Sequence, residues 1–122
     1  MKLMIVDDSN IIRKMIENTV RSLGLEIAAV AGNGEEAVEL FKRTLPDIVT
    51  MDITMPKLDG IGCLKQIMNI KPETRVVMCT ALKDHETGLA ALKAGAFGFV
   101  SKPFTAVQLT EELTAAMNDI AG

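Results

Sequence analysis

The segment Leu3-Met4-Ile5-Val6-Asp7-Asp8-Ser9 decides the fold, because a short apolar run stops there at two adjacent acids. Runs of this length are typical of strands buried on both faces, as the strands of a parallel sheet are. Four more such runs follow along the chain, at residues 27–30, 48–51, 76–79 and 97–100. The sequence therefore predicts five buried strands.

Helix-length stretches separate these runs, and their apolar residues recur three and four positions apart, the spacing of a helix with one buried face. The stretches lie at about residues 11–23, 34–44, 60–70, 84–95 and 105–120. Asn33 and Thr105 are typical N-caps, and Gln108 completes a capping box with Thr105. Strict alternation of five strands and five helices predicts an α/β fold, a doubly wound five-stranded parallel sheet with helices on both faces.

The composition of the 122 residues is that of an ordinary globular domain, with 48% hydrophobic and 24% charged residues. A net charge of −3 gives no general attraction to nucleic acid or to an anionic membrane. The first apolar run is too short for a signal peptide, and no stretch approaches a membrane span. Cys63 and Cys79 have neither metal-ligand nor disulfide spacing. We therefore expect a cytoplasmic chain with a single domain over residues 1–122 and no output domain.

Polar residues follow four of the five predicted strands. The residues directly after these strands are Asp7, Asp8 and Ser9 for the first, Asp52 for the third, Thr80 and Ala81 for the fourth, and Ser101, Lys102 and Pro103 for the fifth. Because ligands of doubly wound sheets bind at the carboxyl ends of the strands, these residues mark the expected site. Three clustered carboxylates repel one another, and Mg²⁺ relieves that conflict because it takes carboxylate oxygens, backbone carbonyls and waters as ligands.

Lys102 and Thr80 add a cation and a hydroxyl to this predicted edge. Lys102 lies just ahead of a helix N-terminus, where the helix dipole disfavours a cation, so we expect it to reach back to an anion. Thr80 offers its hydroxyl to a phosphoryl oxygen. A carboxylate nucleophile beside Mg²⁺, an ammonium and a hydroxyl is the set of groups that forms an aspartyl phosphate.

Five motifs lie at these strand ends and in the segments that follow them. They are Val6-Asp7-Asp8-Ser9, Met51-Asp52-Ile53-Thr54-Met55-Pro56, Asp59-Gly60, Thr80-Ala81 and Phe99-Val100-Ser101-Lys102-Pro103-Phe104. With these motifs in this order, the chain resembles the receiver domains of two-component response regulators along essentially its full length, and it is most similar to the stand-alone chemotaxis members of that family. The resemblance implies a flavodoxin-like sheet with strand order 2-1-3-4-5.

The resemblance also implies the roles of the acids. Asp52 accepts a phosphoryl group from a sensor histidine kinase, and Asp7, Asp8, Asp52 and the backbone carbonyl of Thr54 hold Mg²⁺. The chain catalyses only its own phosphorylation and dephosphorylation, so it is not expected to be an enzyme with a diffusible substrate. The implied partners are the kinase, a downstream protein such as the flagellar motor switch, and a phosphatase. The chain itself is expected to be a monomer.

A switch is implied in the same way. Lys102 pairs with the phosphoryl group, Thr80 swings towards it, and Phe99 moves inward behind Thr80. The surface of the fourth helix, fifth strand and fifth helix is thereby remodelled for a partner. Phe99 stands where many relatives have Tyr, so no hydroxyl is available to that partner. Leu82 cannot orient a water, so we expect the phosphoryl group to live longer than in relatives with an acid or amide at that position. The peptide bond before Pro103 is commonly cis in this family.

Each site residue also has a simpler structural interpretation. Asp7-Asp8-Ser9 could cap the first helix, and Asp52 could be a turn residue. Lys102 could be a solvated loop lysine, and Thr80 a buried threonine bonded to the backbone. Phe99 could be an ordinary core residue.

Other functions are compatible with such a sheet. A phosphatase of the haloacid dehalogenase type needs Asp-x-Asp after its first strand, whereas Asp52-Ile53-Thr54 lacks the second acid and lies on the third. A flavodoxin-type carrier needs aromatic residues, and this chain has no Trp or Tyr. A receiver-shaped module that takes no phosphate usually loses part of the acid, Thr and Lys set. A phosphorelay carrier or a regulator of a non-chemotaxis output stays open.

Overall fold

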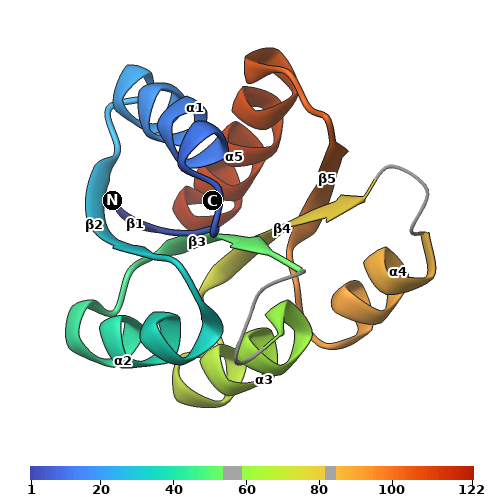
Figure 1. The fold of residues 1–122 in the computed structure, drawn as a ribbon. Coiled ribbons are helices and arrows are strands. Elements are labelled where there is room, and N and C mark those ends of the chain that lie inside the picture. Colours follow the sequence, from blue (N-terminus) through green and yellow to red (C-terminus); the bar gives the residue numbers. More distant parts are fainter. Residues whose placement is uncertain (54–58, 82–84) are drawn as a thin grey trace.

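A computed structural model describes residues 1–53, 59–81 and 85–122, in which strands and helices alternate (Figure 1). The strands are β1 (Lys2–Val6), β2 (Glu26–Ala31), β3 (Ile48–Asp52), β4 (Arg75–Ala81) and β5 (Gly98–Lys102). The helices are α1 (Asn10–Ser22), α2 (Gly34–Thr44), α3 (Gly60–Ile70), α4 (His85–Lys93) and α5 (Ala106–Ala121). All strand pairs are parallel, in the order β2-β1-β3-β4-β5. The expected fold and strand order are confirmed.

The sheet separates two hydrophobic cores. Helices α1 and α5 cover one face, and α2, α3 and α4 cover the other (Figure 1). Alternate residues of β3 serve different cores, because successive side chains of a strand point to opposite faces. Val49 and Met51 join the core under α2, α3 and α4, whereas Ile48 joins the core under α1 and α5.

The helix starts follow the local capping signals. The Asn33 side chain accepts a hydrogen bond from Glu36 N at 2.9 Å, at the start of α2. Thr105 and Gln108 form the complete capping box at the start of α5. Ser9 caps α1, where its Oγ accepts from Ile12 N at 3.4 Å. These contacts satisfy backbone N–H groups that have no partner within the helix.

The strands end later than the apolar runs indicate. Asp52 is the last residue of β3, and Thr80 and Lys102 lie inside β4 and β5 rather than after them. Ladder pairing continues through polar residues at this edge, with Thr80 opposite Ser101. Phe97 precedes β5. The expectation that all five strands are buried on both faces is also wrong for β2 and β5, which are edge strands and are mostly half-buried.

Charged contacts link the segments at the amino end of the sheet. Lys71 Nζ lies 3.2 Å from the carbonyl oxygen of Leu45 and 3.8 Å from Asp47 Oδ1. Arg75, the first residue of β4, donates from Nε to Asp119 Oδ2 of α5 at 2.7 Å. The amino ends of β3 and β4 are therefore tied to the loops and the helix beside them.

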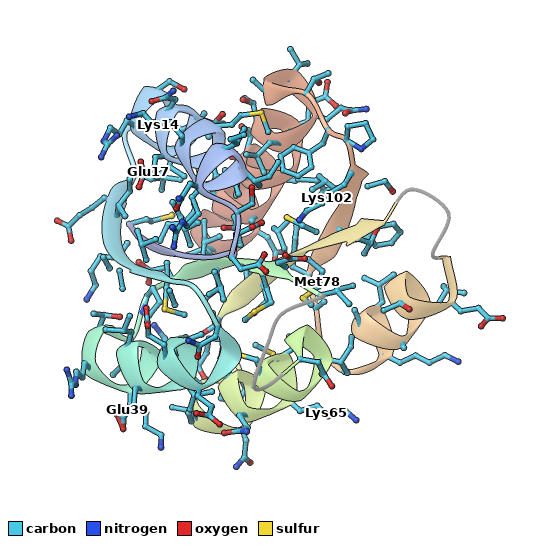
Figure 2. All side chains as sticks on the ribbon, viewed as in Figure 1. Lys14, Glu17, Glu39, Lys65, Met78 and Lys102 are labelled. Carbon is cyan, nitrogen blue, oxygen red and sulfur yellow. The ribbon has the colours of Figure 1, made fainter. Side chains whose placement is uncertain are left out.

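Charged side chains of several helices lie on the outside of the domain. Lys14, Glu39 and Lys65 point away from the sheet into solvent (Figure 2). Cys63 and Cys79 are free and buried. Within the described parts of the chain, no helix has both the length and the apolar character needed to cross a membrane.

Candidate functional site

Three carboxylates meet at the carboxyl edge of the sheet. β1 and β3 are neighbours, so Asp7 directly after β1 comes close to Asp52 at the end of β3. One oxygen from each of Asp7, Asp8 and Asp52 lies within 4.8 Å of the others. Asp7 and Asp52 are 0% and 5% exposed, whereas Asp8 is exposed to solvent. The cluster is therefore buried on one side and open to water on the other.

The backbone fixes the orientation of Asp7. Its N–H donates to the carbonyl of Ala31 in β2 at 3.0 Å, and its Oδ1 accepts from Ser9 N at 2.8 Å. Ser9, not Asp7, provides the α1 cap. Capping of α1 by the Asp7-Asp8-Ser9 segment is therefore confirmed for Ser9, whereas the second carboxylate oxygen of Asp7 faces Lys102.

Lys102 connects two of the acids. From β5 its side chain runs across the carboxyl edge of the sheet (Figure 2), and Nζ lies 3.3 Å from Asp52 Oδ2 and 3.4 Å from Asp7 Oδ2. Burial by itself lowers the pKa of the Lys102 ammonium, but the Asp52 and Asp7 carboxylates outweigh burial and raise that pKa above its ordinary value. The ammonium is therefore charged at neutral pH. The expectation that Lys102 reaches back to an anion is confirmed, and the solvated-loop interpretation is wrong.

The donor set fits a hard divalent cation. Three carboxylates face one ammonium among the described residues of the cluster, so negative charge is in excess there. Mg²⁺ is commonly held by one or two carboxylates and several waters in octahedral geometry. The exposed Asp8 leaves the solvent side of the cluster accessible to such waters.

Thr80 and Phe99 lie on the α4 side of the same edge. Thr80 is 2% exposed and lies two residues after Met78, which is opposite Phe99 in the ladder. Met78 and Phe99 both belong to the core under α2, α3 and α4, so Thr80 shares their face of the sheet. An ideal Cβ on Gly88 of α4 would lie 3.4 Å from the tip of the Phe99 ring. The ring therefore packs directly on α4.

Comparison with known proteins agrees with this geometry. The model of the response regulator receiver domain matches residues 3–114. This chain is a member of the receiver domain family. It is 43% identical to the chemotaxis protein CheY of Thermotoga maritima, over 92% of this chain and 93% of that protein. It is 42% identical to CheY of Bacillus subtilis, over 96% of this chain and 98% of that protein.

Solved structures show the same relationship. In the CheX-CheY-BeF3-Mg²⁺ complex of Borrelia burgdorferi, the matching chain superposes with a TM-score of 0.90 at 37% identity. The match covers 95% of this receiver domain and 88% of that chain. Receiver domains are phosphoacceptor switches with an acidic Mg²⁺ pocket, and the clustered Asp7, Asp8 and Asp52 are consistent with such a pocket.

Some predicted features of the receiver domain remain predictions. Thr54 and Leu82 lie outside the described residues, so the carbonyl ligand and the water-orienting position stay predictions.

The peptide bond between Lys102 and Pro103 is cis, as expected for the family.

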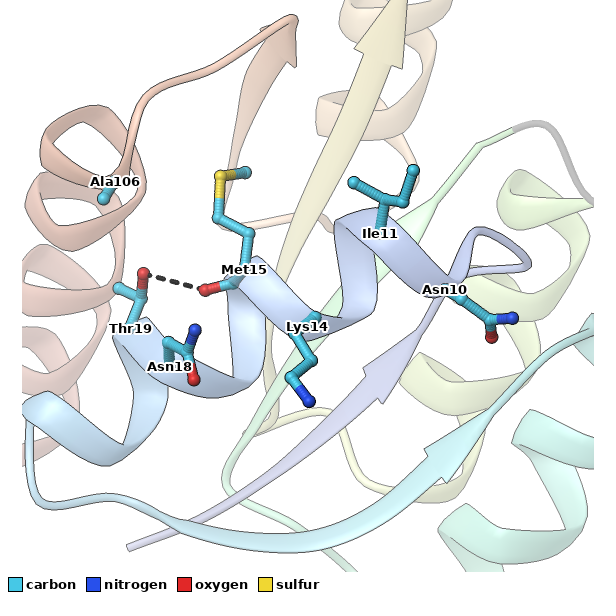
Figure 3. A pocket seen from close by; sticks show the side chains of 7 residues that line it. All are labelled: Asn10, Ile11, Lys14, Met15, Asn18, Thr19 and Ala106. Atoms are coloured by element: carbon cyan, nitrogen blue, oxygen red, sulfur yellow. Dashed lines mark hydrogen bonds between the residues drawn. The ribbon is translucent and has the colours of Figure 1, made fainter.

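The sequence did not predict a surface groove that the structure shows beside α1. An open groove of about 600 Å³ lies along α1 beside the start of α5 (Figure 3). Ile11, Met15 and Ala106 give it an apolar lining, while Lys14 and Asn18 border it. None of the described residues that line the groove is an acid, so the groove is distinct from the carboxylate cluster. Alternation of apolar and polar residues along α1 explains a buried face but does not predict a hollow beside it.

Proposed function

We propose that this chain is the phosphoacceptor switch of a two-component system, acting in chemotaxis, with Asp52 as the phosphorylated residue. The observation that supports this most directly is the position of Asp52. Its carboxylate lies within 4.8 Å of two other acids and 3.3 Å from the Lys102 ammonium. A lone turn residue would need none of these neighbours.

The reaction is a transfer between a phosphohistidine and a carboxylate. A carboxylate oxygen of Asp52 forms the new bond to phosphorus as the bond between phosphorus and the kinase imidazole breaks. Asp7, Asp8 and Asp52 would hold Mg²⁺, with the Thr54 carbonyl as a further ligand. Bound there, the ion neutralises phosphoryl charge. The chain contributes mostly position and electrostatic stabilisation.

Lys102 and Thr80 carry the signal away from Asp52. Phosphorylation adds about two negative charges and three strong acceptor oxygens, as for other phosphorylated residues. The Lys102 ammonium, already beside Asp52, pairs with these oxygens, and the Thr80 hydroxyl donates to one of them. Phe99 then follows Thr80 on the shared face of the sheet. The surface of α4, β5 and α5 thereby shifts towards its partner-binding state.

The partners follow from the family. The phosphodonor is a chemotaxis-type histidine kinase, the output is a protein target such as the flagellar motor switch, and a phosphatase resets the switch. The chain is a monomeric receiver unit that turns over no diffusible substrate and binds neither nucleic acid nor membrane. Its two unpaired, buried thiols suit the reducing cytoplasm.

The decisive experiment labels the protein with acetyl phosphate in the presence of Mg²⁺ and locates the product by mass spectrometry. We expect one phosphoryl group on Asp52 and none on Asp52→Asn. Repeated recovery of unmodified wild-type protein would exclude the proposal. Affinity capture with and without beryllofluoride then distinguishes a motor target from a phosphorelay partner or a non-chemotaxis output.

A further inference from the structure

We propose that Gly60, the first residue of α3, is a positioning residue for Asp52. Its lack of a side chain lets the start of α3 rest directly on the backbone that carries the phosphoacceptor. This inference depends on the proposed phosphorylation of Asp52, and it adds a residue outside the acid, Thr and Lys set.

The contact between Gly60 and the end of β3 leaves no room for a methyl group. An ideal Cβ on Gly60 would overlap the carbonyl oxygen of Asp52 and lie 2.6 Å from Ile53 Cα and 3.0 Å from Ile53 O. All three are backbone atoms, so none can rotate out of the way. Gly60 also lacks a positive φ, which the structure shows at Gly24 and Gly95. Space, not backbone conformation, therefore requires glycine here.

Hydrogen bonds hold Ile53 from two sides. The Gly60 N–H donates to the carbonyl of Ile53 at 2.8 Å, and the Ile53 N–H donates to the carbonyl of Cys79 at 3.2 Å. Asp52 itself is opposite Cys79 in the ladder of β3 and β4. The residue that follows the phosphoacceptor is thus fixed between α3 and the neighbouring strand.

The cap of α3 completes this arrangement. Asp59 Oδ1 accepts from Gly62 N at 2.7 Å, and the carbonyl of Asp59 accepts from Cys63 N at 3.0 Å. The Gly60 N–H, which has no partner within the helix, is the one that reaches Ile53. A shift at the helix start would therefore move the backbone of Asp52 relative to Asp7 and Lys102.

Gly32 provides a matched control. It directly follows β2 on the same edge of the sheet, and a Cβ there would contact only the flexible Arg13 side chain, at 3.6 Å. Gly32→Ala makes the same chemical change with room to accommodate it. A general effect of replacing glycine near the site would appear in both variants.

The test compares wild type, Gly60→Ala and Gly32→Ala. Mg²⁺ affinity is measured by calorimetry, labelling by acetyl phosphate by mass spectrometry, and folding by circular dichroism. For Gly60→Ala we expect Mg²⁺ affinity and labelling rate each to fall about tenfold or more, the size seen when groups that orient metal ligands are lost. Gly32→Ala should stay within about twofold of wild type. A folded Gly60→Ala with wild-type affinity and rate would overturn the inference.

A second pair of variants covers the case in which Gly60→Ala fails to fold. Asp59→Ala and Asp59→Asn remove the same charge, but only Asn keeps a good N-cap. We expect weaker Mg²⁺ binding for Asp59→Ala than for Asp59→Asn, because the loosened α3 no longer fixes Ile53. Equal affinities would count against the inference.

Failure of the proposed function gives a different result. A wild-type chain that neither binds Mg²⁺ nor accepts phosphate would exclude phosphorylation of Asp52 itself. Amide chemical shifts of Asp52, Ile53 and Cys79 still report on the contact in that case. They should change in Gly60→Ala and not in Gly32→Ala, and unchanged shifts would show that Gly60 does not position this backbone.

Discussion

Lys102 Nζ lies 3.3 Å from Asp52 Oδ2 although their strands are not neighbours. β4 separates β3 from β5, so the lysine side chain crosses the end of β4 to reach the acid. Asp7 approaches the same ammonium from β1 at 3.4 Å. The Lys102 ammonium therefore connects β5 with the end of β3 and with Asp7, directly after β1.

Replacing Lys102 with Met should destabilise the metal-free protein and strengthen Mg²⁺ binding. The change leaves Asp7 and Asp52 buried without their cation, which we expect to lower the free energy of unfolding by about 1–3 kcal/mol. The substitution also removes the ammonium that competes with Mg²⁺ for the Asp7 and Asp52 carboxylates. Denaturant unfolding with and without Mg²⁺ measures both effects. If Lys102→Met unfolded at the same denaturant midpoint as wild type in metal-free buffer, the contacts of Lys102 with Asp7 and Asp52 would not stabilise the fold.

The stability difference between wild type and Lys102→Met should depend on pH in a direction that the pKa of Lys102 fixes. The pKa of Lys102 is raised in the folded state because the acids outweigh burial. The contribution of the pair to stability is therefore complete below the unfolded lysine pKa of about 10.4 and is lost as pH rises through the higher folded value. We expect the stability gap between wild type and Lys102→Met to stay constant from about pH 7 to 9 and to narrow above that range.

Both cysteines should resist thiol reagents in the native protein. Burial, with a smaller effect from Asp59, raises the pKa of Cys63 to about 12. Burial is also the main reason that the pKa of Cys79 is about 12. The reactive thiolate is thus scarce at pH 8. Ellman's reagent should react slowly with folded protein and rapidly with two thiols after unfolding in guanidinium. Rapid modification of the folded state would contradict the buried positions.

Thr50→Val should leave stability unchanged or raise it by up to about 1 kcal/mol. Thr50 is fully buried between Ile5 and Val77, and its hydroxyl has no hydrogen-bond partner in the described part of the chain. Removing an unsatisfied buried polar atom at constant shape costs little. Thr19→Val is the control, because the Thr19 hydroxyl donates to the Met15 carbonyl at 3.1 Å. We expect Thr50→Val to have a higher melting temperature than Thr19→Val.

Gly88→Ala should stabilise the protein by about 0.5–1 kcal/mol, the usual cost of a glycine inside a helix. A methyl group there would meet the Phe99 ring at 3.4 Å, an ordinary contact distance. Gly95→Ala is the opposite case, because φ is +110° and a Cβ would lie 3.1 Å from Met68 Cγ. We expect the melting temperature to rise in Gly88→Ala and to fall in Gly95→Ala. A lower melting temperature for Gly88→Ala would mean that the ring needs the empty space.

Leu82→Glu should shorten the lifetime of the phosphoryl group. We expect a carboxylate at this position to orient water for attack on phosphorus, which leucine cannot do. The loss of label from purified phosphoprotein, followed in wild type and Leu82→Glu, measures this effect. An unchanged or slower loss in the variant would remove the idea.

Local signals predicted the elements well. Asn33 and Thr105 cap their helices as expected because capping depends on residues three positions away. Strand ends were predicted less well, since Thr80 and Ser101 join the ladder through pairing between strands that no local pattern reveals. The strand order came from family resemblance for the same reason.

Within the site, the gathering of Asp7, Asp8, Asp52 and Lys102 was predicted from their positions at the ends of strands, because the carboxyl ends of parallel strands share one edge of the sheet. Their residue types then predicted a divalent cation among the acids. The role of Gly60 was not predictable in the same way. A glycine in a sequence indicates that a close approach or an unusual turn is needed, but it does not indicate which atoms come close. At Gly60 these atoms belong to residues 52 and 53, and the contact arises only when α3 packs against the end of β3.

The ion pairs at the amino end of the sheet bear on how the molecule could respond. Lys71 pairs with Asp47 and Arg75 pairs with Asp119 at the amino edge of the sheet. The carboxyl edge holds the Asp7, Asp8 and Asp52 cluster and the Lys102 ammonium. Charges are paired at the amino edge, whereas negative charge is in excess at the carboxyl edge. A charge added at the carboxyl edge is therefore expected to act first on the strand ends there and on α4 beside them.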